Sequence, residues 1–188
     1  MNVLAWNIRG LNDPLKQQEV LVLLLNNKVD VAAVIETHVK EDAINLVWKN
    51  KLAGFSLVTN NKYHSNGRIW VFWVPAKVSV VVYGMSAQHI HCQVLHRISK
   101  QTFEITFVYA FNLGSQRRAL WDSLQSIALG VSLPWICLGD YNVTLSAEER
   151  QGSAQVNYGD MEEFKDCLEL FGLTDLPSTG LTYTWYNG

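Results

Sequence analysis

Long apolar runs are absent from this sequence. No stretch approaches the roughly 18 uninterrupted apolar residues of a membrane span, and residues 1–6 lack the basic start and long apolar centre of a signal peptide. Cysteine is scarce too, because Cys92, Cys137 and Cys167 are odd in number, far apart and set in apolar patterns. We therefore expect no membrane partner, no disulfide or zinc framework, and three small core residues in a reducing, intracellular compartment.

An excess of charge of one sign is also missing. The 15 Lys and Arg residues and the 17 Asp and Glu residues leave a net charge of -2 at pH 7. A chain with this balance does not attract nucleic acid as a whole, so contact with a phosphate backbone needs a local basic patch or a divalent cation. The charge neither supports nor excludes a polyanionic substrate.

Apolar and aromatic residues, by contrast, are plentiful. Of the 188 residues 48% are hydrophobic, and 7 Trp, 7 Tyr and 7 Phe are among them. This composition excludes general disorder and is enough for one substantial core, but the chain is too short for two. We expect a single domain over residues 1–188, without an internal repeat or a linker.

Hydrophobic periodicity predicts strands interspersed with helices. The expected strands are residues 2–8, 31–35, 54–59, 68–74, 77–83, 90–94, 103–109, 135–138 and 181–185. Helices are expected at residues 14–28, 41–50, 115–129 and 160–171. Strand-rich halves with a helix on each outer side predict an α+β fold, a four-layer α/β/β/α sandwich of two mostly antiparallel sheets.

Two details of this pattern concern pairing and packing. The β-rich runs at residues 68–74 and 77–83 are separated by Pro75-Ala76, which predicts a hairpin. The helix at residues 14–28 begins after an N-cap at Asp13. Its buried stripe is expected from Leu15, Leu21, Val22 and Leu25.

Two polar groups are expected on the surface. His89 and His91 alternate with apolar residues along one strand, so their face should be solvated. Arg117 and Arg118 stand near the start of an amphipathic helix, on its exposed side.

The run at residues 135–142, WICLGDYN, is a buried strand that ends in polar residues. Asp140 and Asn142 stand two positions apart where the strand opens into a loop, so both side chains can face one crevice. An acid suits a proton acceptor or metal ligand, and an amide suits a donor to an anionic oxygen. A plain turn is the alternative, because Gly, Asp and Asn are common turn formers.

Polar side chains end three other predicted strands. Asn7 closes the first strand, Glu36 follows the second, and Tyr109 ends the strand at residues 103–109. A half-buried core position is an equal alternative for Tyr109, since Tyr is often partly buried. Repetition of acids and amides at strand ends indicates a shared site.

Read in chain order, these strand ends resemble the successive motifs of the endonuclease/exonuclease/phosphatase superfamily. The motifs are WNIRG with Asn7, IETH with Glu36, VYAFN with Tyr109 and Asn112, and LGDYN with Asp140 and Asn142. The tail resembles the endonuclease domains of LINE-type (non-LTR) retrotransposons, particularly plant ones. Its matching residues are Phe164, Cys167-Leu168, Gly172-Leu173, Asp175-Leu176-Pro177, Gly180 and Tyr183-Thr184-Trp185, with Glu149-Arg150 and Gly152 before them.

The resemblance implies a DNase I-like fold and a Mg²⁺-dependent phosphodiesterase that nicks DNA, with Mn²⁺ as another possible cofactor. It makes Glu36 the principal metal ligand, with Asn7 beside it on metal or phosphate. Asp140 would orient or deprotonate the water or handle the leaving-group proton, while Asn142 and Tyr109 would bind the phosphate. DNA is the implied partner, without an obligate protein partner, and the nucleus is the implied compartment.

Substrate contacts are expected from Arg9, Asn112 and Arg150, and Arg117 and Arg118 are further candidates for contact with the phosphate backbone. For each arginine, ordinary solvated surface charge is at least as good an interpretation.

The chain departs from the family pattern at its end. The last family motif, Ser-Asp-His, and the strand before it are absent, so we expect a domain that is incomplete at its C-terminus. A catalytically inactive remnant is therefore one alternative function, and a phospholipid or inositol phosphate hydrolase is another. None of the five histidines stands in a context that matches the missing one, and no substitute role is expected of them.

Overall fold

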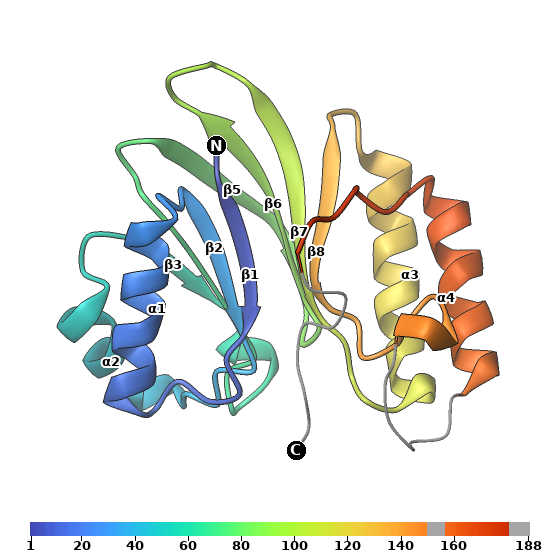
Figure 1. Cartoon of the computed structure of the whole chain (residues 1–188), viewed down its shortest axis with the longest axis horizontal. Helices are drawn as coiled ribbons and strands as arrows, with labels where there is room; N and C mark the ends of the chain where they lie inside the picture. The colour runs from blue at the N-terminus through green and yellow to red at the C-terminus, as the bar shows by residue number, and fades with distance from the viewer. Residues whose placement is uncertain (150–156, 181–188) are drawn as a thin grey trace. The chain divides into compact units, whose positions relative to one another are not determined.

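The structure is a computed structural model that describes residues 1–149 and 157–180 (Figure 1). The elements are β1 (Val3–Asn7), α1 (Pro14–Asn26), β2 (Val31–Ile35), η1 (Glu41–Ala43), α2 (Ile44–Lys51), β3 (Ser56–Thr59), η2 (Asn61–Tyr63), β4 (Ile69–Trp73), β5 (Val78–Met85), β6 (His89–His96), β7 (Thr102–Tyr109), α3 (Gly114–Gly130), β8 (Trp135–Asp140), η3 (Ala147–Glu149) and α4 (Tyr158–Phe171). The elements labelled η are short 3-10 helices. The predicted strand at residues 181–185 and the predicted contact Arg150 lie outside the described residues.

The chain forms two compact units. The first consists of Met1–Ala110 and Val131–Asp140, and the second of Phe111–Gly130 and Tyr141–Gly188. All eight strands, α1 and α2 belong to the first unit, whereas α3 and α4 belong to the second. The single domain expected for residues 1–188 stays a prediction. Within the described ranges, no helix is both long and apolar enough to cross a membrane.

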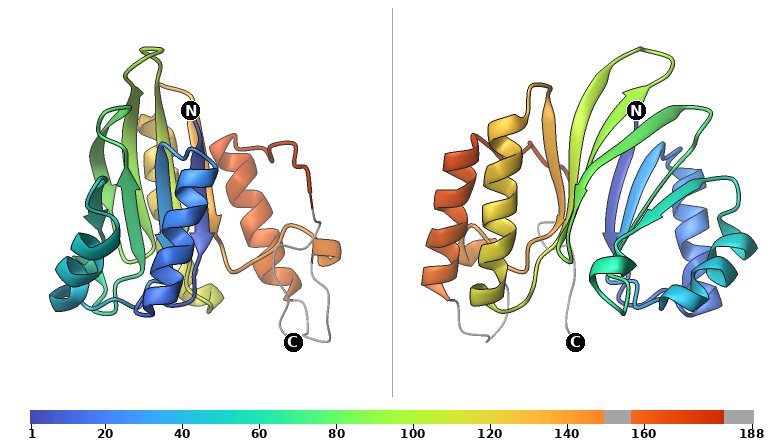
Figure 2. Two further views of the ribbon diagram at one scale, coloured as in Figure 1. Left: turned by 60° about the vertical axis from the view of Figure 1, so that its left-hand side comes forward. Right: turned by 180° about the vertical axis from the view of Figure 1, so that it is seen from behind.

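The first unit contains two four-stranded sheets. Their strand orders are β1-β2-β4-β3 and β5-β6-β7-β8. Pairing is antiparallel except for one parallel pair in each sheet, β1 with β2 and β7 with β8. The α+β class with two mostly antiparallel sheets is therefore confirmed. In Figures 1 and 2, α1 and α2 lie side by side on the outer side of the first sheet.

Strand β2 lies at the centre of this packing, because both of its faces are buried. Ala32 and Val34 pack with α1 in one apolar cluster, while Ala33 packs between the two sheets in another. The second cluster also holds Val71 of β4, Ile90, Cys92 and Val94 of β6, and Ile105 and Phe107 of β7. Burial on both faces explains why β2 is an unbroken apolar run, VAAVI, rather than an alternating one.

The predicted hairpin across Pro75-Ala76 is wrong. Strand β4 pairs with β2 and β3 in the first sheet, whereas β5 pairs with β6 in the second, so the chain crosses between sheets here. The crossing is fixed by Asp30, whose carboxylate lies 2.7 Å from Lys77 Nζ and whose carbonyl oxygen accepts from the backbone N–H of Val74. Because β4 is almost fully buried, it needs a neighbour on each edge.

The predicted buried stripe of α1 is also wrong, because most of its residues face the solvent. Leu15, Val22 and Leu25 are 73%, 44% and 61% exposed, and the helix instead buries Gln17, Val20 and Leu24. Leu21 of the predicted stripe is partly buried and does pack against the core. Gln17 can be buried because its side-chain amide donates to the carbonyl oxygen of Leu11 at 3.0 Å. The predicted cap at Asp13 is confirmed, since its carboxylate accepts from the backbone N–H of Leu15.

His89 and His91 of β6 are buried rather than solvated. His91 lies between Glu104, at 3.0 Å from its Nε2, and the Thr106 hydroxyl, at 2.9 Å from its Nδ1. His89 meets the Ser86 hydroxyl at 2.8 Å. Burial lowers the pKa of His89 to about 4, helped by the charge of His91, so His89 is neutral at pH 7. Alternation predicts which face a side chain takes, but not whether polar partners allow that face to be buried.

Gly139 in β8 is predicted to be irreplaceable. Its φ is 145°, and an added Cβ would collide with the backbone of Val108 in the neighbouring β7. We expect Gly139→Ala to lower the free energy of unfolding by about 2–4 kcal/mol, measured by urea denaturation. Gly84→Ala in β5, where nothing lies within 4 Å of the added carbon, is the matched control and should change stability little. Equal effects of the two substitutions would contradict this account.

Candidate active site

Four of the predicted site residues lie at the same end of the two parallel strand pairs. Asn7 is paired with Ile35 in β1 and β2, which places Glu36 directly beyond this pair. Tyr109 and Asp140 are paired at the ends of β7 and β8. Polar side chains at the carboxyl ends of parallel strands are well placed for a ligand site. All four residues belong to the first unit, and the structure brings them together.

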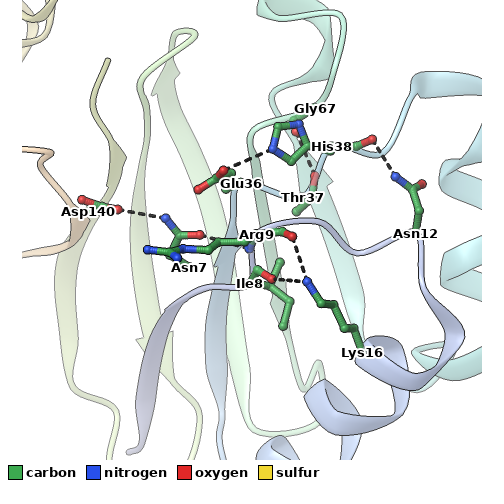
Figure 3. Close-up of polar contacts among 10 residues, drawn as sticks. All are labelled: Asn7, Ile8, Arg9, Asn12, Lys16, Glu36, Thr37, His38, Gly67 and Asp140. Carbon is green, nitrogen blue, oxygen red and sulfur yellow. Dashed lines mark hydrogen bonds and ion pairs between the residues drawn. The ribbon is translucent and has the colours of Figure 1, made fainter. Parts of the chain in front are cut away.

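The amide of Asn7 is a polar partner of the acidic side chains of the site, and Figure 3 shows its bond to Asp140. Its Nδ2 donates to Asp140 Oδ2 at 2.9 Å, and the side chain also hydrogen-bonds to Glu36. Its Oδ1 accepts from the backbone N–H of Arg9 at 3.1 Å, which fixes the orientation of the amide. In this structure Asn7 is therefore a neutral donor to two carboxyl groups from different sheets.

Glu36 is held in place by its main chain. Its backbone N–H donates to the carbonyl oxygen of Arg68 at 2.7 Å, and its own carbonyl accepts from Gly10 at 2.7 Å. Its φ of 58° is unusual for a residue with a side chain, and such conformations persist where surrounding contacts enforce them. These hydrogen bonds hold the backbone of Glu36 in a conformation that differs from the extended strand β2 before it.

The pKa of the Glu36 carboxyl is lowered. Burial acts to raise it, but this is outweighed by hydrogen bonds from Asn7, His38 and Tyr109 together with the charge of His38. Glu36 is therefore a carboxylate at neutral pH. An ionised oxygen ligand is what a hard divalent cation requires.

Tyr109 is a neutral donor in this site. Burial, followed by the nearby charge of Glu36, raises the pKa of its hydroxyl to about 12. The guanidinium carbon of Arg68 lies 5.0 Å from the ring centroid, within the range of a cation–π contact. Tyr109 is buried in the apolar cluster between the sheets, which confirms its character as a core residue, and its role as a site residue stays a prediction.

Three supporting residues were not expected from the sequence. His38 Nε2 lies 3.3 Å from Glu36 Oε1, although no role was expected of any histidine. Lys16 Nζ binds the carbonyl oxygens of Ile8 and Arg9 at 3.0 and 2.8 Å, which fixes the loop after β1 (Figure 3). Arg68 directly precedes β4, and the pairing of β4 with β2 places it next to Glu36 and Tyr109. Of these three residues, only His38 could be linked to the site from the sequence, because it stands two positions after Glu36.

The remaining predicted residues that the structure describes are divided between the two units. Arg9 is exposed beside Asn7 in the first unit, whereas Asn112 and Asn142 belong to the second unit. There the guanidinium of Arg117 binds the carbonyl oxygens of both asparagines, at 2.9 and 3.0 Å. The expectation that Arg117 is exposed is therefore wrong: it is 2% exposed. Arg118, by contrast, is exposed as expected.

The donor set of the first unit suits a divalent cation that keeps water and substrate ligands. Among the described residues, no three His, Cys, Asp or Glu side chains converge on one point. A cage made wholly of protein ligands is therefore not formed there. Mg²⁺ commonly binds through one or two carboxylates plus substrate phosphates, and the Glu36 carboxylate fits that chemistry.

A family model described as the Endonuclease/Exonuclease/phosphatase family matches residues 4–188, and the chain therefore belongs to this family. Enzymes of the family generally depend on a divalent metal. A comparison with curated proteins found no match.

Solved structures share the fold. The endonuclease domain of TRAS1, described as a telomere-specific non-LTR retrotransposon, is similar with a TM-score of 0.68 and 12% identity, over 90% of this chain and 71% of that one. An AP endonuclease from Leishmania major has a TM-score of 0.69 and 12% identity, over 89% of this chain and 65% of that one. D. rerio TDP2 complexed with a single-strand DNA product has a TM-score of 0.55 and 15% identity, over 76% and 60%. These similarities confirm the DNase I-like fold.

The lowered pKa of Glu36 predicts a pH-dependent contribution to stability. Because folding lowers this pKa below its ordinary value of 4.5, the carboxylate contributes fully above about pH 4.5, and the contribution is lost as the pH falls through the folded pKa. We expect the difference in unfolding free energy between wild type and Glu36→Gln to change by about 1 kcal/mol between pH 6 and pH 3. Denaturant melts across this range measure the change.

Asn7→Ala is the control for this measurement. It removes one donor to the Glu36 carboxylate, so in an Asn7→Ala background the pH-dependent part of the Glu36→Gln difference should shrink. A difference that grows toward acid pH would reverse the sign and contradict the assignment.

Proposed function

We propose that this protein is a divalent-metal-dependent phosphodiesterase that nicks DNA and derives from a LINE-type (non-LTR) retrotransposon of the plant-like group. One observation carries the proposal: Asn7, Glu36, Tyr109 and Asp140, from four separate motifs, come together at the ends of two parallel strand pairs. Membership of the family supports the reaction class.

Glu36 and Asp140 take different roles in this proposal. Glu36, ionised and fixed by its main chain, holds the cation, with Mg²⁺ as the expected ion and Mn²⁺ as an alternative. When bound, the cation supplies positive charge to the scissile phosphate. Asp140 orients the attacking water or accepts its proton, while the bond from phosphorus to the leaving sugar oxygen breaks.

The neutral donors complete the proposed site. Tyr109, whose pKa is raised to about 12, keeps its proton and can hydrogen-bond to an anionic phosphate oxygen. The amide of Asn7 holds Asp140 through its Nδ2 and can contribute its oxygen to metal or phosphate. Asn142 and Asn112 of the second unit, with Arg9, are proposed to bind the DNA backbone.

DNA as substrate and a retrotransposon origin rest on two further points. The tail motif from Phe164 to Trp185 resembles LINE-type endonuclease domains. Two of the similar structures are, by their descriptions, the endonuclease domain of a non-LTR retrotransposon and a protein bound to a DNA product. A nuclear location would follow from this origin.

Nicking of supercoiled plasmid by the 188-residue chain tests the proposal. With Mg²⁺ or Mn²⁺ we expect conversion to open circles, and with EDTA none. Glu36→Gln and Asp140→Asn should each lower the rate by about 10²–10⁴-fold, because each removes a group that acts on the reacting atoms. Gel densitometry over time gives the rates.

The matched controls are Glu19→Gln on α1 and Asp42→Asn in η1, two exposed carboxylates changed in the same way. Both should keep the wild-type rate. No metal-dependent nicking by the folded wild type, or equal rates for Glu36→Gln and Glu19→Gln, would refute the proposal. A parallel panel of inositol phosphates and phospholipids would show the alternative hydrolase activity if those substrates are cleaved instead.

A further inference from the structure

Among the described residues of the second unit, Arg117 is the most deeply buried charged side chain, and it takes no part in the proposed chemistry. It lies in the first turn of α3, and its side chain is 3% exposed. A buried charge is unfavourable unless it is paired and hydrogen-bonded, so its partners must define its role.

The partners of Arg117 come from two loops and a second helix. Its Nη1 donates to the carbonyl oxygens of Phe111 and Asn112 at 3.1 and 2.9 Å, in the segment that precedes α3. The same nitrogen donates to the carbonyl oxygen of Asn142 at 3.0 Å, in the segment that follows β8. Its Nη2 forms an ion pair with the carboxylate of Asp160 in α4.

Only a guanidinium can make this set of contacts. It offers several N–H donors in one rigid plane, so that one end of the fork can bind carbonyl oxygens while the other binds a carboxylate. A lysine ammonium at this position would keep the charge but present its donors from a single point. The geometry therefore requires the shape of arginine and not only its charge.

The neighbourhood of Arg117 is built to keep this arrangement. A Cβ at Gly114 would collide with the carboxylate of Asp160, so a glycine there leaves room for Asp160 in its position beside Arg117. The rings of Trp121, Tyr141 and Phe164 stack beside each other, with centroids 4.9–6.4 Å apart. Tyr141 precedes Asn142, and this packing therefore holds the second loop from its other side.

We propose that Arg117 is a positioning residue that joins the loops of Asn112 and Asn142, so that the two asparagines bind the DNA backbone as one unit. The inference rests on the proposed function, because it assigns Arg117 to the substrate contacts named there. Asn142 has a φ of 50°, an uncommon conformation that the bond from Arg117 to its carbonyl oxygen helps to hold.

A double-mutant cycle tests the coupling. The affinity for a fluorescein-labelled duplex oligonucleotide, without divalent metal, is measured for wild type, Asn142→Ala, Arg117→Lys and the double variant. Asn142→Ala should weaken binding by about tenfold in the wild type, the scale of one lost hydrogen bond to a charged group. In the Arg117→Lys background the same change should weaken binding less than about twofold, because the loop is no longer held in place.

Arg118→Met is the matched control. Arg118 is the neighbouring arginine, exposed and 3.4 Å from Glu163 of α4, so it shares the helix and the type of partner but not the loop contacts. In the Arg118→Met background, Asn142→Ala should keep its full tenfold effect. If it also keeps that effect with Arg117→Lys, Arg117 only stabilises the second unit and the inference is overturned.

Asp160→Asn provides the milder variant in case Arg117→Lys does not fold, as judged by circular dichroism. It removes the charge that anchors the guanidinium and leaves the three carbonyl contacts in reach. The effect of Asn142→Ala should then fall to between about twofold and tenfold, and an undiminished effect overturns the inference. If Asn142→Ala has no effect in the wild type, the substrate role proposed for Asn142 fails and the inference fails with it. Failure of the inference alone leaves that wild-type effect intact.

Discussion

The apolar layer between the two sheets fixes the positions of all four strand ends that carry the candidate site. Ala33 and Val71 pack there with Ile105 and Phe107, and each sheet contributes one parallel pair. Parallel strands deliver their C-terminal residues to the same edge of a sheet. Face-to-face packing of β2 and β7 therefore determines which polar side chains can meet.

Once the strand ends meet, their charges must be accommodated. Glu36 and Asp140 bring two carboxyl groups from different sheets, and the neutral amide of Asn7 hydrogen-bonds to both. A donor in this position lessens their mutual repulsion without the fixed positive charge that would compete with a cation. His38 and Tyr109 add further donors to Glu36. Glu36 thus stays a carboxylate, and no fixed positive charge from Asn7 competes with a divalent ion for it.

The sequence predicts strand ends well and pairing poorly, for a physical reason. Asn7, Glu36 and Asp140 were identified because each ends an apolar run, which is a local pattern. Strand β4 pairs with β2 and not with β5, and this pairing depends on contacts between distant segments. The short connection at Pro75-Ala76 predicts a hairpin instead. Arg68 and Lys16 support the site only through the pairing of β4 with β2 and through the placement of α1. The prediction of the buried stripe of α1 is wrong for a similar reason: Gln17 is buried because of a hydrogen bond, which a pattern of hydrophobic residues does not predict.

Two arginines that might have bound a polyanion are already engaged within the protein. Arg117 is buried on carbonyl oxygens and Asp160, and Arg68 lies over the ring of Tyr109. With a net charge of -2, the chain does not replace them with a general excess of positive charge. Under the proposed function, recognition of a phosphate backbone would then depend on neutral amides, the Tyr109 hydroxyl, a bound cation and the single arginine Arg9. Such contacts depend on exact placement of donors more than on attraction at a distance. This would explain why a buried arginine is used to hold two asparagine loops instead of contacting the phosphate itself.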